Sequence, residues 1–347
     1  MSFFKNLFHK GEGGESVIVI DIGADSVAGA YVRYEEKDPP TLVYSRNLPI
    51  EVHTGEPHER AMLRALTVLG EDLIREGAPV LARHTGSGRA DRILVSVDAP
   101  WQETDVRSEH FEEAEPFLFT KGLLDRRLEE TRVELSKKLL ADESIIGTIL
   151  NGYETRNPYG KKVHRATVIV LTSFIAENVA NGILTTLSGL FHTKDILPIA
   201  GNSLRYQVMR EVFPHERNAI ILDATGGSIT SVALVRKGIF AVLVQVTNPE
   251  DKQQWASTVI DEFAEIAKHY PLPRTIFLLA REQEILALRE MLDAANFGTL
   301  WLSDSPPKIV PVLRSNIPGG IRQVSPRPAD IVLLFMTLYH QSRRNAQ

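Results

Sequence analysis

The sequence predicts an α/β protein built from two related halves. Segments rich in Val, Ile and Leu alternate with amphipathic helical segments in both halves, which is typical of helices covering mixed sheets. The same hairpin pattern also occurs twice, at residues 17–33 and 219–238, and each time a β run ends on an aspartate before a turn of small residues. With 347 residues, the chain is longer than one hydrophobic core usually serves. Two domains are therefore expected.

The first half is expected to begin with the hairpin 17–33, where Gly23 opens the turn because glycine tolerates a positive φ. Pro and Gly favour another turn at residues 157–160, Asn-Pro-Tyr-Gly, between two β runs. Thr120 is the expected N-cap of a strongly periodic helix. The further elements expected in this half are strand 41–50, helix 58–76, a loop over 77–91, strand 92–100, a polar strand over 101–113, helix 119–140, helix 174–190, strand 195–201 and a helix from residue 202.

The second half is expected to open with the hairpin 219–238, where Gly226 and Gly227 open the turn. Only one helix is predicted between this hairpin and the next strand. The elements expected after the hairpin are helix 252–270, strand 274–280, helix 282–295, two short β runs near Leu300 and Val310, and helix 329–341.

Composition is that of an ordinary soluble globular protein, with 43% hydrophobic and 24% charged residues. A formal net charge of −5 gives no electrostatic support for nucleic acid as the main partner. The absence of cysteine excludes disulfides and thiolate metal ligands, and no close histidine spacing predicts a zinc site. The sequence contains no motif typical of a hydrolase nucleophile, a P-loop or a protein kinase.

Residues 1–14 are predicted to form a separate N-terminal amphipathic segment. On a helix, its apolar side chains share one face, and these are Phe3, Phe4, Leu7 and Phe8. Two interpretations stay open. The segment is either a terminus that frays or docks on the protein itself, or a short helix that contacts a membrane surface or a protein partner.

The two hairpin turns are candidate phosphate-binding sites. Small residues allow backbone N–H groups to approach a ligand closely, and two such turns facing each other would hold the phosphates of a nucleotide from both sides. Asp21 and Asp223 would then lie beside a magnesium ion, which prefers oxygen ligands. The structural alternative is that Asp and Gly are present only because they favour turns.

The order and spacing of these motifs resemble the actin-like ATPase superfamily, and within it the cell-division protein FtsA and the type IV pilus assembly protein PilM. Three stretches carry the resemblance: MSFFKNLFHK ahead of VIVIDIGADSV, an insertion with FTKGLLDRRLEE and ILNGYETRNPYGKKVHRATVIVLTS, and LPIAGNSLRYQVM ahead of NAIILDATGGSITSVALVRKG. The resemblance covers most of residues 1–245 and becomes thin afterwards.

The resemblance implies duplicated actin-like (ribonuclease H-like) domains with an FtsA/PilM-type small inserted subdomain and a reduced second small subdomain. The implied divisions are the N-terminal segment 1–14, a first actin-like subdomain 15–100 with 190–216, an inserted subdomain 101–189, and a second actin-like subdomain 217–347. If nucleotide binding is retained, Asp21 and Asp223 would hold Mg²⁺. The residues that would contact the nucleotide are Asp21, Gly23, Ala24, Ser26, Asp223, Gly226, Gly227 and Ser228.

Several positions depart from the superfamily pattern. The first motif has Ala28 where a lysine often stands, and it places the anionic Asp25 in a turn meant for phosphates. In the second motif, Thr225 replaces a glycine and Thr230 replaces the closing acid. The late strand runs into Arg281 without the glycine-rich turn that would lie against adenosine. The expectation is therefore weak or lost ATP binding, no hydrolysis and no resident cofactor.

As a whole, the resemblance implies a scaffold and not an enzyme. It would lie in the cytoplasm at the inner membrane and organise a type IV pilus, secretion or division assembly, by self-association or by binding the cytoplasmic peptide of a membrane partner. The resemblance places the peptide groove between the inserted subdomain and the first domain, around residues 157–160. Two alternatives stay open: a functional ATP-binding switch of the same kind, and a small-molecule kinase of the same superfold.

Overall fold

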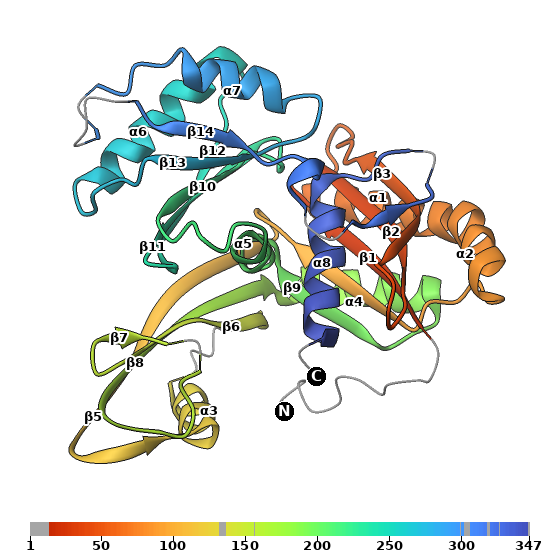
Figure 1. Cartoon of the computed structure of the whole chain (residues 1–347). Helices are drawn as coiled ribbons and strands as arrows, with labels where there is room; N and C mark the ends of the chain where they lie inside the picture. Colours follow the sequence, from red (N-terminus) through yellow and green to blue (C-terminus); the bar gives the residue numbers. More distant parts are fainter. Residues whose placement is uncertain are drawn as a thin grey trace.

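Three β-sheets surround one central helix in this protein. The computed structural model describes residues 14–131, 137–155, 157–298, 300–301, 306–317, 320–325 and 327–345. Helix α5 (Gly201–Val212) lies at the centre, between the two large sheets and above the inserted sheet (Figure 1). This position makes α5 the element that all three sheets share.

The first sheet is mixed and has the strand order β15-β3-β2-β1-β4-β9. β1 pairs antiparallel with β2 and parallel with β4. Every residue of β1 after the first is buried, because helices cover both faces of the sheet. The strands are β1 (Glu15–Ile22), β2 (Ser26–Tyr34), β3 (Thr41–Pro49), β4 (Arg92–Val97), β9 (Ile196–Ala200) and β15 (Arg322–Gln323).

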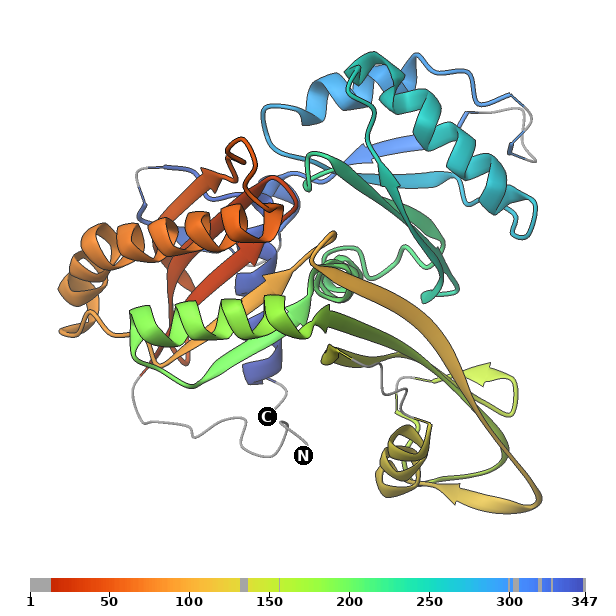
Figure 2. The ribbon, with the colours of Figure 1, turned by 180° about the vertical axis from the view of Figure 1, so that it is seen from behind.

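Helices cover both faces of this sheet, α1 (His58–Asp72) and α4 (Glu177–Phe191) on one side and α8 (Ile331–Asn345) with α5 on the other. α1 and α4 lie side by side on the first face (Figure 2). The side chain of Ile18 packs into their core, whereas that of its neighbour Val17 packs into the core under the C-terminal helix α8. The alternation follows from the two-residue period of a strand.

The second sheet repeats the arrangement of the first. Its order is β12-β11-β10-β13-β14, and β10 pairs antiparallel with β11 and parallel with β13, as β1 does with β2 and β4. The prediction of two related α/β halves is confirmed. The elements are β10 (Ala219–Asp223), β11 (Ile229–Arg236), β12 (Ile239–Thr247), a 3₁₀ turn (Lys252–Gln254), α6 (Trp255–Ala267), β13 (Thr275–Leu279), α7 (Ile285–Asp293), β14 (Lys308–Pro311) and a 3₁₀ turn (Arg314–Asn316).

The inserted sheet is antiparallel, has the order β5-β8-β6-β7 and packs against α3 (Lys121–Glu130). The expected N-cap is confirmed, since Thr120 Oγ1 accepts a hydrogen bond from the N–H of Leu123 over 3.2 Å. The helix predicted over 119–140 is wrong in its last residues, because residues 138–140 begin β6 and pair with the end of β8. The strands are β5 (Gln102–Phe119), β6 (Lys138–Leu150), β7 (Tyr153–Glu154) and β8 (Lys161–Ala176).

Two boundaries differ from the division that the sequence implies. The inserted subdomain 101–189 would include α4, but α4 packs on α1 of the first sheet, so the inserted sheet ends with β8. The second subdomain 217–347 would include β15 and α8, but β15 pairs with β3, and α8 packs on β1 and β2. The chain therefore crosses back from the second half to the first.

Three predicted local elements also differ. The loop expected over 77–91 begins as helix: a π-helical turn (Leu73–Gly77) continues α1 into α2 (Ala78–Thr85), which ends at Gly86 with φ 76°. Strand β12 is not predicted from the sequence. Leu300, expected near a β run, is not in a strand.

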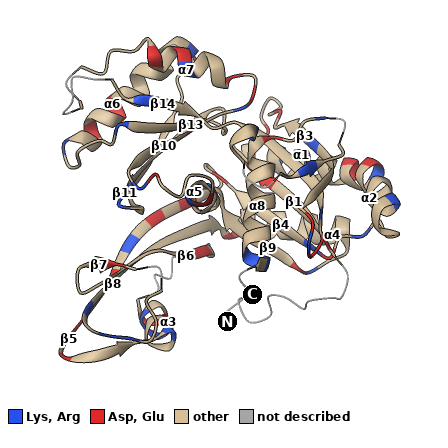
Figure 3. Ribbon diagram, in the orientation of Figure 1, with Lys and Arg blue, Asp and Glu red and all other residues tan. Residues whose placement is uncertain are grey.

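The N-terminal helix expected to carry Phe3, Phe4, Leu7 and Phe8 lies outside the described residues. Within the part of the chain that the structure describes, no helix is long and apolar enough to cross a membrane. Charged residues of both signs are interspersed over the sheets and their helices (Figure 3).

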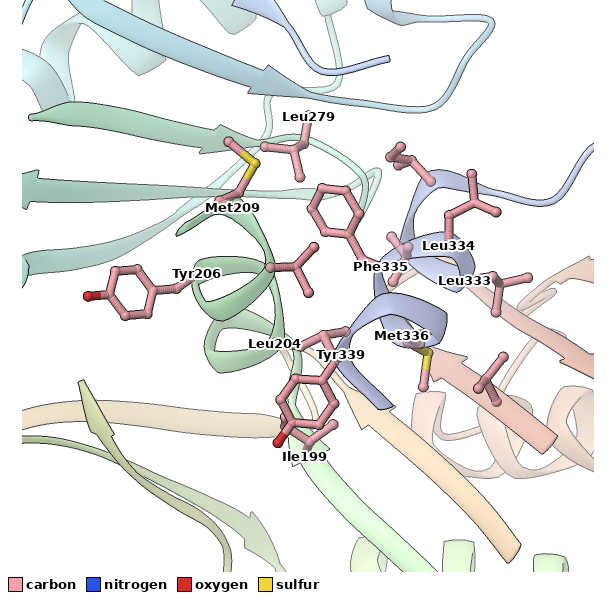
Figure 4. Close-up of a cluster of buried hydrophobic side chains, with 14 of the residues drawn as sticks. Ile199, Leu204, Tyr206, Met209, Leu279, Leu333, Leu334, Phe335, Met336 and Tyr339 are labelled. Carbon is pink, nitrogen blue, oxygen red and sulfur yellow. The ribbon is translucent and has the colours of Figure 1, made fainter. Parts of the chain in front are cut away.

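The largest hydrophobic core lies where α5 meets α8 and both large sheets. Leu204 and Met209 of α5 pack in one cluster with Phe335 of α8 and Leu279 at the end of β13 (Figure 4). Phe335 and Leu279 are fully buried. Because this cluster takes residues from both halves, α5 is held directly between them.

Candidate functional site

The two predicted aspartates lie where the halves meet. Asp21 lies in β1 opposite Ala28, and Asp223 lies in β10 opposite Ser231. Both residues are buried, with exposures of 9% and 7%. β1 and β10 hold equivalent positions in the two sheets, and ligand sites of such α/β folds lie at the carboxyl ends of these strands. The structure therefore brings the two acids to one junction, where the charge of Asp223 acts on Asp21.

The first hairpin turn uses its polar groups within the chain. The N–H of Gly23 donates to the carbonyl of Ser26 over 2.9 Å, and the carbonyl of Gly23 accepts from Trp101 Nε1 over 2.7 Å. Gly23 does not adopt the positive φ expected for it. Ala24 is fully buried. Ser26 Oγ accepts a hydrogen bond over 3.2 Å from Nη2 of Arg281, which follows β13 in the other half.

The second turn touches the first. Gly227 has φ 75°, the conformation that favours glycine, and its carbonyl accepts from Asn248 Nδ2. The N–H of Ser228 donates to the carbonyl of Gly226 over 3.0 Å. Ser228 Oγ donates to Asp25 Oδ1 over 2.6 Å. A Cβ on Gly227 would overlap Asp25 Oδ2, so the glycine makes room for this carboxylate.

A buried arginine stands at the centre of the junction. The side chain of Arg205, on α5, is 3% exposed. Its Nη1 and Nη2 donate to the two carboxylate oxygens of Asp98 over 3.0 and 2.6 Å, a bidentate arrangement. Its Nε forms an ion pair with Asp223 Oδ2, and Nη2 also donates to Thr225 Oγ1 over 3.2 Å. One guanidinium therefore joins the first half to the second.

The acids around Arg205 have perturbed pKa values. Burial raises the pKa of Asp98 to about 7; Arg205 acts against this rise, and the charges of Asp21 and Asp223 add to it. Burial also raises the pKa of Asp21, against the opposing effects of the charge of Arg205 and of the nearby Ser96 hydroxyl. Burial acts to lower the pKa of Arg205, but the three carboxylates outweigh it and raise it. The guanidinium therefore keeps its charge, and three acids share one permanent cation.

The substituted positions of the second motif have structural roles. Thr225 donates to Asp223 Oδ1 from both its N–H and its Oγ1, over 2.9 and 2.6 Å. Thr230 is fully buried; its Oγ1 donates to Asn248 Oδ1 over 2.7 Å and accepts from Trp255 Nε1 over 2.9 Å. Thr225 thus orients the carboxylate of Asp223 through two hydrogen bonds. Thr230 links β11 to α6 through a hydrogen bond between uncharged groups.

Asp223 and Asp25 have partners within the chain, whereas the buried Asp21 Oδ1 has no hydrogen-bond partner among the described residues. A magnesium-bound nucleotide between Asp21 and Asp223 would have to displace Arg205 from Asp223 and separate Asp25 from Ser228. Ala28, 3% exposed opposite Asp21, offers no cation to a phosphate. Among the described residues, no group of three His, Asp or Glu side chains could hold a metal ion. The residues in this arrangement do not fit a metal–phosphate group.

Three residues of the junction are not singled out by the sequence: Asp98, Gly201 and Arg205. The sequence does contain a signal for Asp98, because this aspartate directly follows a buried β run. Asp21 and Asp223 are predicted from the same pattern, an aspartate at the end of an apolar run. Arg205 has none, since a charged helical residue is ordinarily expected on the exposed face. Gly201 is explained only by contact, because a Cβ there would overlap Asp98 Oδ1 and Arg205 Nη1.

A separate pocket of about 230 Å³ lies between the inserted sheet, the end of α5 and the second sheet. Phe213 and Pro214, which follow α5, form its apolar wall. Arg217 forms an ion pair with Glu154 of β7 and donates to the carbonyl of Lys237 over 2.8 Å. The lining residues are Glu154, Thr155, Arg210, Phe213, Pro214, Glu216, Arg217 and Gly238.

The Asn-Pro-Tyr-Gly turn, residues 157–160, lies elsewhere. The ring of Tyr159 stacks on that of Phe119 with centroids 6.0 Å apart, and the N–H of Gly160 donates to the carbonyl of Phe119 over 2.9 Å. This is the distal end of β5 and β8, because the other end of β8 leads into α4 on the first sheet. The turn therefore does not lie between the inserted subdomain and the first domain, where the peptide groove was expected.

These features define the class of protein. Two sheets with equivalent strand order, hairpins that meet at one junction, and a third sheet inserted into the first half make an actin-like fold, as the sequence predicted. No protein-family model matches the chain, and no curated protein is significantly similar to it.

Among solved structures, the chain is similar to a chain of the PilM–PilN type IV pilus biogenesis complex. The TM-score is 0.54 at 11% identity, covering 94% of this chain and 98% of that chain. It also aligns with a Bacteroides thetaiotaomicron protein of actin-like ATPase fold and unknown function, with TM-score 0.48 and 8% identity over 93% and 96% of the two chains. A third is the cytoplasmic domain of EpsL, an inner-membrane component of the type II secretion system of Vibrio cholerae, with TM-score 0.39 and 10% identity over 96% of each chain. The first similarity extends the PilM-like fold over nearly the whole chain.

Proposed function

We propose that this protein is a PilM-like actin-type scaffold that lies at the cytoplasmic face of an inner membrane and serves a pilus or secretion assembly. The observation that carries the proposal is the similarity in fold to a chain of the PilM–PilN complex over 94% of this chain and 98% of that one. The similarity takes in the inserted sheet as well as the two actin-like halves.

The proposed scaffold works without ATP turnover. The support is chemical: the acid expected beside magnesium, Asp223, is paired with Arg205, and the turn expected to hold phosphates is filled by Asp25. Transition-state charge in phosphoryl transfer needs a positioned cation, and Arg205, the cation among these acids, is already bidentate to Asp98.

The proposed partner site is the pocket between β7, the end of α5 and the second sheet. Its apolar wall, Phe213 and Pro214, would take a hydrophobic side chain of a short cytoplasmic peptide, and Arg217 and Glu154 would bind polar groups beside it. The pocket borders the inserted sheet, as the expected groove does, but its other walls come from the end of α5 and from the second half.

A peptide-binding titration tests this proposal. The probes are fluorescein-labelled synthetic peptides that match the cytoplasmic segments of membrane proteins encoded by neighbouring genes. We expect one of them to bind the full chain saturably, and Phe213→Ala or Arg217→Glu to weaken it at least about tenfold. Arg83→Glu on α2 is the matched control, because it is exposed and remote from the pocket. Absence of saturable binding, or equal affinity in the pocket variants, would contradict the proposal.

A further inference from the structure

A magnesium-bound nucleotide would bring a metal cation and phosphate anions to the junction between the two halves. In this chain, side chains at the junction already supply one charge of each sign. The cation is the guanidinium of Arg205, and the anion is the carboxylate of Asp25. Each contacts a residue that the sequence predicts for ligand binding: Arg205 pairs with Asp223, and Asp25 accepts from Ser228. Both contacts join the first half to the second.

Arg205 takes the place of a divalent cation. It comes from α5 in the first half, holds Asp98 of the same half through two hydrogen bonds, and reaches Asp223 and Thr225 of the other half. Breaking this contact would leave buried carboxylates without a partner, which is strongly unfavourable. The contact is specific, because Gly201 must lack a side chain for Arg205 and Asp98 to approach each other.

Asp25 takes the place of a phosphate. Its Oδ1 accepts from Ser228 Oγ over 2.6 Å, and its Oδ2 occupies the space where a side chain at Gly227 would lie. A glycine with positive φ at such a turn ordinarily allows an anion to approach the backbone. Here the anion belongs to the opposite hairpin. A third contact, from Arg281 to Ser26, joins the same two halves over 3.2 Å.

From these contacts we infer that the chain carries an internal substitute for the metal–nucleotide group, and that this substitute holds the two halves closed in the absence of any ligand. Domain closure in two-domain proteins ordinarily follows ligand binding, because the ligand contacts both sides. In this protein the contacting groups are side chains of the chain itself, so closure needs no ligand. The inference concerns the conformation of the halves and does not depend on the scaffold role.

A distance measurement across the junction tests the inference directly. The chain has no cysteine, so two can be introduced for spin labels without background. Val52 lies two residues after Ile50, whose N–H donates to the carbonyl of Asp25. Leu286 lies in the first turn of α7, shortly after Arg281. The two side chains are 51% and 64% exposed. Double electron–electron resonance on Val52→Cys/Leu286→Cys is expected to give one narrow distance distribution that Mg-ATP does not change.

Arg205→Met in this labelled background is expected to shift the distribution to longer distances and to broaden it. Arg289→Met is the matched control, because Arg289 forms only an exposed ion pair within α7. Arg205→Met alone leaves the buried carboxylates of Asp98 and Asp223 without their cation, which could unfold the protein. The triple variant Arg205→Met/Asp98→Asn/Asp223→Asn removes the same contact and also the negative charges of these two acids. A distribution that stays narrow and unshifted in both Arg205 variants would overturn the inference. The inference would also be overturned if the labelled protein that retains Arg205 gave a narrow distance distribution only in the presence of Mg-ATP.

Discussion

At the scale of single residues, Arg205 organises the junction. Its guanidinium is 3% exposed and contacts Asp98, Asp223 and Thr225. Removing one partner of a buried charge network leaves the others uncompensated. We therefore predict that Arg205→Met lowers the free energy of unfolding by about 3–5 kcal/mol in urea denaturation. Arg289→Met, at an exposed ion pair, should change it by less than about 1 kcal/mol. Equal losses in the two variants would contradict this assignment.

A second charged cluster fixes the start of β1 to the C-terminal helix. The carboxylate of Glu15 lies 2.9 Å from Arg92 Nε, 3.1 Å from His340 Nε2 and 3.2 Å from Arg344 Nε. Burial acts to raise the pKa of Glu15, but the hydrogen bond with His340 and the charges of His340, Arg92 and Arg344 lower it below its usual value. This cluster joins the two ends of the described chain.

The lowered pKa of Glu15 makes part of the stability depend on pH. An acid whose pKa is lower in the folded state stabilises the fold above its unfolded pKa, and the contribution is lost as the pH falls through the folded value. We predict that Glu15→Gln destabilises the protein at pH 7, and that its difference from the natural chain shrinks as the pH falls below about 4.5. Glu35→Gln, at a 54% exposed side chain, is the control. A difference that does not vary with pH would argue against the cluster as its source.

The residues of the junction illustrate what a sequence can reveal. Asp21 and Asp223 are found from sequence because each closes a buried β run before a turn of small residues, a strictly local pattern. Asp98 follows a third such run. The partner of these acids, Arg205, comes from a helix distant in sequence, and its burial depends on packing between α5 and both halves. No local pattern contains that information.

At the scale of elements, α5 is the common support of the three sheets. Gly201 and Arg205 face the junction, whereas Tyr206 OH donates to the carbonyl of Gly238 over 2.7 Å, and Ser203 Oγ donates to Ser144 Oγ of β6 over 3.2 Å. The helix therefore contacts both the second half and the inserted sheet. A shift of α5 would alter its contacts with both of them.

Gly201 gives a sensitive test of this position. In a helix, Ala is ordinarily more stable than Gly by about 1 kcal/mol. At residue 201, however, a Cβ would overlap Asp98 Oδ1. We predict that Gly201→Ala destabilises the protein by about 1–3 kcal/mol in urea denaturation. Gly189→Ala on α4 is the matched control, because its Cβ would meet no atom within 4 Å, and it should be neutral or stabilising. Neutral behaviour at both sites would contradict the close packing of α5.

The elements that differ from the prediction do so for different reasons. The helical period of residues 119–140 continues past Glu130, yet residues 138–140 form a strand because they pair with β8. The segment after α1 stays helical through a π turn, which no simple periodicity predicts. β12 pairs with β11, its immediate neighbour in the chain. For residues 138–140 a distant partner, the end of β8, decides the local conformation.

At the scale of the whole molecule, the duplicated hairpin predicts the two halves correctly, because buried β runs and their turns are encoded locally. No local pattern predicts that α8 packs on the first sheet. The apolar residues of α8 could cover a sheet of either half, and the packing of Phe335 against α5 depends on the complete fold. The fold could thus be predicted in class and duplication, whereas the closed junction could not.

In this actin-like fold, the junction expected to bind a nucleotide is occupied by the chain's own charged side chains, Arg205 and Asp25. Calorimetric titration of the full chain with Mg-ATP tests whether this junction still binds a nucleotide. Because Arg205 and Asp25 occupy the groups that would bind metal and phosphate, we predict no saturable heat, corresponding to a Kd weaker than about 1 mM. Saturable binding in the micromolar range that is lost in Asp223→Ala would contradict this prediction.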